Sequence, residues 1–155
     1  MKKIILGLCI LVLLTGCNKT ENISKKIEVT NKTCKIVKEK DTHGGFLGDG
    51  DHFAIIECDD LSNKDLSDNW KELPLTDNIL EIVNMPQCND DGCKTAFDRY
   101  DVPDIKNGYY LFVDRHDSVK NKYDDTELNI RSSYNFSLSI YDKDNNKIYL
   151  YELDT

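Results

Sequence analysis

The stretch YNFSLSIYDKDNNKIYLYEL, residues 134–153, decides the fold class. Large side chains at Tyr134, Phe136, Leu138 and Ile140 alternate with neighbours that are mostly small and polar, which is the two-residue period of a β-strand. The turn-forming residues DKDNN separate this strand from a second stretch rich in aromatic and aliphatic residues. We therefore predict a β-hairpin that ends the chain.

Further strands are predicted upstream of this hairpin. Thr33–Glu39 and Phe53–Cys58 flank a turn-rich stretch, and Tyr109–Val113 is apolar on both faces, which favours a covered, central strand. Ile27 and Val29 give a weaker strand signal. The sequence therefore predicts an α+β fold, mainly an antiparallel β-sheet of about five strands with a few short helices, after a signal peptide.

The helical patterns between these strands are short. Leu66, Trp70 and Leu73 recur at helical spacing, and Pro74 would end such a helix. Asp77 begins a second short stretch, in which β-branched residues leave helix and strand nearly balanced.

The N-terminus has the layout of a bacterial export signal. Two lysines precede an apolar run from Ile4 to Leu14, which is broken only by Gly7 and Cys9. As a helix this run spans about 16 Å, which is too short to cross a hydrocarbon core, so a signal peptide is favoured over a transmembrane helix. The sequence Leu-Thr-Gly-Cys that follows resembles the lipobox of bacterial lipoproteins. It predicts cleavage before Cys17 and a diacylglyceryl group on its thiol; the alternative is an ordinary secretory peptide with an incidental cysteine.

The predicted domain organisation follows from this cleavage site. Residues 1–16 are the lipoprotein signal peptide, residues 17–26 the lipidated N-terminus and a polar tether, and residues 27–155 a single α+β domain. The mature chain has a net charge of −10, because cleavage removes two lysines from a chain of charge −8. An anionic membrane surface repels such a domain, so acyl chains have to hold it on the extracytoplasmic face of the cell membrane. The same charge argues against nucleic acid as a partner.

Four cysteines of the mature chain remain free of lipid, and outside the cytoplasm they are expected to form disulfides. Cys34 and Cys58 lie symmetrically about Phe46, which would place them opposite each other in a hairpin. Cys88 and Cys93 enclose a turn sequence that can close a small ring. A four-cysteine zinc site is the less favoured alternative, because neither pair has the two-residue spacing of a zinc knuckle. Free buried thiols are another alternative.

Two segments carry candidate binding residues. The loop from residue 41 to residue 52 has four glycines, which let a backbone approach a ligand closely, but it has neither the lysine of a phosphate-binding loop nor a dinucleotide fingerprint. Its candidates, with those of the end of the apolar strand near residue 113, are His43, Asp49, Asp51, His52, Asp114, Arg115 and His116. The alternative interpretations are a structured connection and a rim of ion-paired residues.

Several segments together resemble a known group of proteins. They are DTHGGF at 41–46 with GDG at 48–50, WK at 70–71 with LPL at 73–75, NGYY at 107–110 with DRH at 114–116, SYNF at 133–136, and LDT at 153–155. From about residue 33 onward the chain resembles small, uncharacterised exported proteins and lipoproteins of Gram-positive bacteria. The resemblance implies no activity, so no catalytic residue is carried over. The segment from Cys88 to Cys93 departs from the group.

The functional hypothesis is a non-enzymatic, membrane-anchored module that binds a protein, a peptide or an envelope component and needs no cofactor. No motif of a serine or cysteine nucleophile is present in the sequence. The alternative is a metal-dependent or acid–base enzyme that uses His43, His52, Asp114 and His116, the residue types that such chemistry requires.

Overall fold

The computed structural model of the protein describes residues 19–44, 48–89 and 92–155. The predicted signal peptide and the lipidation site Cys17 lie outside the described residues, as does Phe46. The regular elements, with their bounds, are α1 (Lys19–Lys26), β1 (Cys34–Asp41), β2 (Gly50–Cys58), η1 (Asn63–Asp65), β3 (Lys71–Glu72), α2 (Asp77–Val83), β4 (Gln87–Asn89), β5 (Gly92–Lys94), α3 (Ala96–Arg99), β6 (Gly108–Asp114), η2 (Leu128–Ile130), β7 (Asn135–Asp142) and β8 (Lys147–Asp154).

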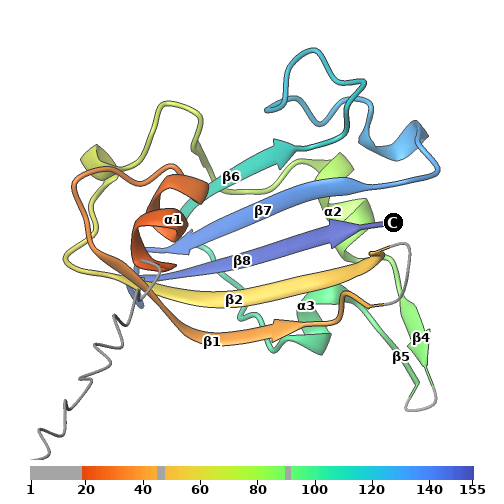
Figure 1. The fold of residues 1–155 in the computed structure, drawn as a ribbon, viewed down its shortest axis with the longest axis horizontal. Coiled ribbons are helices and arrows are strands. Elements are labelled where there is room, and N and C mark those ends of the chain that lie inside the picture. Colours follow the sequence, from red (N-terminus) through yellow and green to blue (C-terminus); the bar gives the residue numbers. More distant parts are fainter. Residues whose placement is uncertain (1–18, 45–47, 90–91) are drawn as a thin grey trace, which may run out of the picture.

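Six of these strands form one antiparallel sheet in the order β1-β2-β8-β7-β6-β3, and β4 and β5 form a separate hairpin (Figure 1). The predicted α+β fold and its mainly antiparallel sheet are confirmed. The C-terminal hairpin closes where Asp142 pairs with Lys147, and Asn146 takes a positive φ of 50° in the turn, a conformation that asparagine tolerates.

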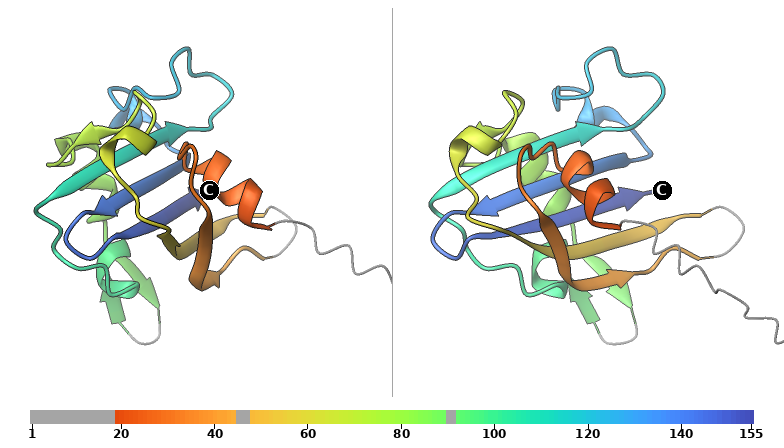
Figure 2. Two further views of the ribbon diagram at one scale, coloured as in Figure 1. Left: turned by 90° about the vertical axis from the view of Figure 1, so that its left-hand side faces the viewer. Right: turned by 60° about the vertical axis from the view of Figure 1, so that its left-hand side comes forward.

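Both faces of the sheet are covered by helices, so the protein has two apolar cores. α1 packs on one face, where Ile23 and Ile27 meet Ile56, Ile148 and other side chains of the sheet. α2 and α3 lie on the opposite face (Figure 2) with a larger core around Phe53, which stacks on Tyr100 with ring centroids 4.5 Å apart. Burial of closely packed apolar side chains on both faces of the sheet stabilises the fold.

The two predicted disulfides are present. Cys34 of β1 pairs directly with Cys58 of β2, and the two cysteines are bonded and buried in the core beneath α1. Cys88 and Cys93 are bonded across the β4–β5 hairpin, where both residues are exposed. The first bond therefore fixes the edge of the main sheet, and the second fixes a surface hairpin.

Three details differ from the sequence-based expectations. The segment expected to be a polar tether includes the helix α1, Lys19–Lys26. Ile23 of α1 and Ile27, just after the helix, are both buried, which holds this segment against the sheet. The helix expected around Trp70 is wrong: this segment enters the short strand β3, and the Trp70 indole Nε1 donates to the Ile27 carbonyl at 3.1 Å. β6 is covered on both faces, as expected. It is not at the centre of the sheet, because only the two-residue strand β3 separates it from the sheet edge.

Candidate functional site

The strands place a row of polar side chains across the sheet on the face that carries α1. Figure 1 shows that α1 lies over only one half of that face. On the other half Asp41, His52, Glu152 and Ser137 are direct partners across β1, β2, β8 and β7, so their side chains project from the same face. This row is the centre of a set of ionisable side chains that we term the charged cluster: Lys26, Glu39, Asp41, His43, His52, Arg115, Glu152 and Asp154.

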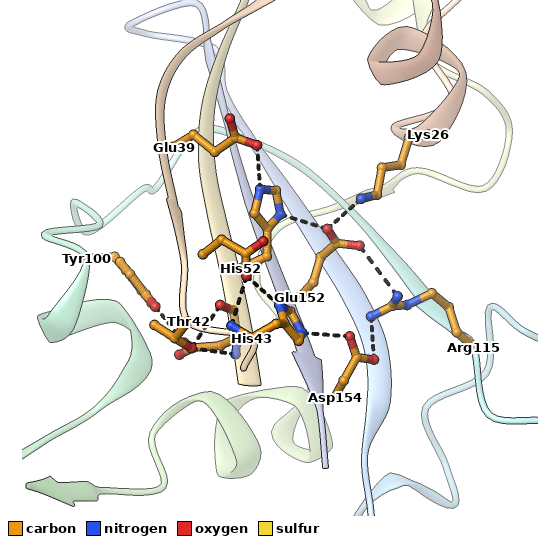
Figure 3. Close-up of polar contacts among 11 residues, drawn as sticks. Lys26, Glu39, Thr42, His43, His52, Tyr100, Arg115, Glu152 and Asp154 are labelled. Atoms are coloured by element: carbon orange, nitrogen blue, oxygen red, sulfur yellow. Dashed lines mark hydrogen bonds and ion pairs between the residues drawn. The ribbon is translucent and has the colours of Figure 1, made fainter. Parts of the chain in front are cut away.

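His52 lies between two carboxylates that come from the strands on either side (Figure 3). Its Nδ1 is 2.8 Å from Oε2 of Glu152 on β8, and its Nε2 is 3.0 Å from Oε1 of Glu39 on β1. An ionised carboxylate only accepts hydrogen bonds, so both contacts are satisfied when both ring nitrogens carry a proton. The geometry therefore favours the imidazolium form of His52.

His43, which follows β1, also lies between two carboxylates. Its Nδ1 is 2.6 Å from Oδ1 of Asp41, and its Nε2 is 3.0 Å from Oδ2 of Asp154 (Figure 3). The His43 backbone N–H also donates to Asp41 at 2.9 Å. Two carboxylate–imidazole–carboxylate bridges thus run side by side from β1 to β8, and both favour a protonated ring.

Two cations complete the charged cluster. Lys26, the last residue of α1, donates to Oε2 of Glu152 at 2.5 Å. Arg115, just after β6, donates to Oδ1 of Asp154 at 2.9 Å and to the Phe136 carbonyl at 3.0 Å. The four carboxylates are therefore balanced by Lys26, Arg115 and two protonated histidines, and loss of both imidazole protons would leave an excess of two negative charges.

Glu152 is the most buried carboxylate of the charged cluster, with 5% of its side chain exposed. Burial raises its pKa, but hydrogen bonds from His52 and Lys26 and the charge of Arg115 outweigh burial and lower the pKa to about 2. The hydrogen bond to Glu152 raises the pKa of His52 against the opposing effect of desolvation. The bond to Asp41 raises the pKa of His43 in the same way. These carboxylates and rings stabilise each other's charged forms.

A second polar group lies on the opposite face of the sheet. Asp51 of β2 is buried there and accepts hydrogen bonds from Arg99 Nη1 at 2.6 Å and from the Tyr100 hydroxyl at 2.8 Å. Thr42 also donates its hydroxyl to the same carboxylate. Burial and the Asp51 carboxylate raise the pKa of Tyr100 well above its usual range. Both carboxylate oxygens of Asp51 therefore accept hydrogen bonds from the protein, and they join the end of α3 to the sheet.

The remaining sequence candidates are distributed over several places. Asp49 is exposed, Asp114 is buried in an ion pair with Arg131, and the His116 ring lies 2.8 Å from the Ser118 hydroxyl. Among the described residues no group of three or more His, Cys, Asp or Glu side chains has the geometry to hold a metal ion. The structure therefore brings His43, His52 and Arg115 together in the charged cluster, while Asp114 and His116 have other partners.

Five members of the charged cluster were not candidates in the sequence. A signal for two of them exists in the last strand, where one face changes from apolar Ile148 and Leu150 to Glu152 and Asp154. The others come from β1 and from the end of α1, and they are Glu39, Asp41 and Lys26. Only the pairing of β1 with β2 and of β2 with β8 brings these acids to the two histidines.

Comparison with known proteins gives information about the N-terminus. The family model for a prokaryotic membrane lipoprotein lipid attachment site matches residues 1–18. The chain is therefore a lipoprotein with a lipid attachment site that anchors it to a membrane. No curated protein and no solved structure matches the chain. Within the described residues, no helix has both the length and the apolar character needed to cross a membrane.

Proposed function

We propose that this protein is a binding module, tethered by lipid on Cys17 to the extracytoplasmic face of the cell membrane, and that its charged cluster receives a protein, peptide or envelope component. The resemblance to exported proteins of Gram-positive bacteria belongs to the same proposal. It rests on one structural observation: eight linked ionisable side chains, from the sheet, from the end of α1 and from the segments after β1 and β6, meet beside α1 on one face of the sheet.

Buried ion pairs such as the one between Glu152 and His52 are a poor way to stabilise a fold. Apolar side chains of similar volume usually stabilise a fold as well as a buried ion pair does, so a buried network of charges is weak support for a purely structural role. The rim of the charged cluster is accessible, since Asp41, Lys26, Glu39 and Arg115 keep 59%, 42%, 41% and 35% of their side chains exposed. Fixed charges of both signs in a rigid sheet are preorganised for a polar ligand, which favours specificity.

Photo-crosslinking on intact cells tests this proposal. Gly44 is exposed beside His43, and a Cβ there would meet only the Thr42 carbonyl at 3.9 Å, so p-benzoylphenylalanine fits at this position. The matched control carries the same amino acid in place of Lys106, an exposed residue that precedes β6 at the opposite end of the sheet. We expect a discrete crosslinked product from position 44 and none of that mass from position 106. The same products from both positions, or none from either, would overturn the proposal.

A variant of the charged cluster sharpens the test. Arg115→Gln removes an accessible cation that contacts Asp154 but is not part of either apolar core. The crosslink from position 44 should weaken in this variant, while circular dichroism and thermal unfolding verify that the sheet is intact. An unchanged crosslink in a folded Arg115→Gln protein would place the partner elsewhere.

A further inference from the structure

The two disulfides differ in their access to solvent. Cys34 and Cys58 are 0% and 5% exposed in the core, whereas Cys88 and Cys93 are both exposed on the β4–β5 hairpin. A thiol reductant has to reach a sulfur atom of a disulfide before it can attack the bond, so access to the sulfur limits the rate of reduction. A reductant in solution therefore reaches the bond from Cys88 to Cys93 and is kept away from the bond in the core.

The hairpin that carries the exposed bond has little other support. β4 and β5 have three residues each, and all six residues are exposed. Among the described elements each of these strands packs mainly against the other, and Figure 1 shows the hairpin projecting from the body of the protein. A two-stranded hairpin on its own is marginally stable at best in water. The disulfide is therefore the main constraint that keeps β4 and β5 paired.

The rest of the fold does not depend on this bond. The bond closes only five residues, so it removes little entropy from the unfolded chain. The hairpin contributes no side chain to either apolar core, and the buried bond from Cys34 to Cys58 still fixes the edge of the main sheet. We therefore expect the oxidised and the reduced protein to be folded alike except in the hairpin.

The base of the hairpin is linked to the main sheet. Gln87, the first residue of β4, accepts a hydrogen bond from Nη2 of Arg99, and Nη1 of Arg99 donates to Asp51 of β2 at 2.6 Å. Asp51 directly precedes His52 of the charged cluster. The contact between Gln87 and Arg99 is thus the first one that a released hairpin would change.

We infer that the bond from Cys88 to Cys93 is a site of thiol–disulfide exchange, at which a protein dithiol reduces the bond and releases the β4–β5 hairpin while the main sheet stays folded. A thiolate of the dithiol attacks one sulfur, and the other cysteine leaves as a thiolate and takes up a proton. The second thiolate of the dithiol then attacks the mixed disulfide. Two electrons pass to the protein, both cysteines end as thiols, and the dithiol leaves as a disulfide. This inference does not rest on the binding role of the charged cluster.

The alternative is a permanent brace, which would stay oxidised in growing cells. Cells are quenched with acid and their free thiols are alkylated. The disulfides are then reduced and labelled with a heavy form of the same reagent, so that mass spectrometry gives the reduced fraction of each cysteine. Cys34 and Cys58 are the internal control, because newly made chains that are not yet oxidised contribute equally to all four cysteines.

The reduced fraction at Cys88 and Cys93 should exceed the fraction at Cys34 and Cys58 by at least about five-fold, since only the exposed bond is accessible to a dithiol. Equal reduced fractions at the two pairs would overturn the inference and identify a permanent brace.

A trapping experiment on the purified lipoprotein tests whether exchange is direct. The probe is thioredoxin with its second active-site cysteine replaced by serine, which stays bound to its substrate as a mixed disulfide. We expect a mixed disulfide at Cys88 or Cys93, present in Cys34→Ala with Cys58→Ala and lost in Cys88→Ala with Cys93→Ala. The absence of a mixed disulfide on the hairpin would overturn the inference.

Limited digestion with trypsin tests the release of the hairpin. Cleavage after Lys94 of β5 should be at least about ten-fold faster in the reduced and alkylated protein, because a protease requires a locally opened backbone. Cleavage after Lys106, which is exposed and outside the hairpin, is the control and should not change. Equal cleavage after Lys94 in the two redox states would show that reduction does not release the hairpin.

Discussion

His52 and Glu152 are 100 residues apart in the sequence and are direct partners across β2 and β8, with the imidazole Nδ1 2.8 Å from the carboxylate Oε2. Glu152 also holds Lys26 of α1, and its second oxygen is 3.7 Å from Arg115. One carboxylate therefore joins the N-terminal helix, the centre of the sheet and the segment after β6. The stability of the fold and the arrangement of the candidate site depend on the same residue.

Glu152→Gln should destabilise the protein by about 3 kcal/mol, because it removes a buried carboxylate and leaves the His52 ring, which is 12% exposed, without its charged partner. Urea denaturation measures this change. The matched control is Asp104→Asn, which removes an exposed carboxylate paired with Lys106 and should cause no measurable change. Similar effects of the two substitutions would mean that the charged cluster is as loosely held as an ordinary surface ion pair.

The stability of the protein should be greatest between about pH 4.5 and pH 6.5, the ordinary pKa values of glutamate and histidine. The raised pKa values of His43 and His52 stabilise the fold below pH 6.5, and this contribution is lost as the pH rises through the folded-state pKa. The lowered pKa of Glu152 stabilises the fold above pH 4.5, and this contribution is lost as the pH falls toward 2.

Thermal unfolding as a function of pH tests this dependence. His52→Gln should flatten the loss of stability on the alkaline side, and Glu152→Gln should flatten it on the acidic side. His116→Gln is the control, because the His116 ring contacts Ser118 outside the charged cluster. If the stability of His52→Gln falls with rising pH as steeply as that of the unchanged protein, the charged cluster does not stabilise the protonated ring of His52.

The two disulfides should contribute unequally. The bond from Cys34 to Cys58 closes a segment of 24 residues and is buried, so Cys34→Ala with Cys58→Ala should cost about 3 kcal/mol. The bond from Cys88 to Cys93 closes only five residues at the surface, and its double alanine variant should cost less. Urea denaturation of both variants gives the comparison. A larger loss from the surface bond, or four free thiols in the non-reduced protein, would contradict this account.

Local patterns in the sequence predict local structure well. The alternation in residues 134–153 predicts the β7–β8 hairpin, and the symmetry of Cys34 and Cys58 about Phe46 predicts the β1–β2 pairing, because strands joined by one turn have a register that the turn sets. The helix expected around Trp70 fails because a tertiary contact, the indole on the Ile27 carbonyl, decides that segment.

The charged cluster needs information that local patterns do not contain. β2 pairs with β8, which lies at the other end of the chain, and no periodicity within either strand specifies that neighbour. His43 and His52 are recognisable as candidates by residue type, but their carboxylate partners on β8 are assigned only by this long-range register.

The claim on which the proposed membrane tethering rests is the lipid on Cys17, and the mass of the N-terminal peptide of the mature protein tests it most directly. Protein extracted from membranes and digested with trypsin should yield a peptide that begins at Cys17 and carries a diacylglyceryl group, and Cys17→Ala should abolish it without unfolding the domain. A mature chain that begins at another residue, or an unmodified Cys17 in membrane-bound protein, would contradict the account.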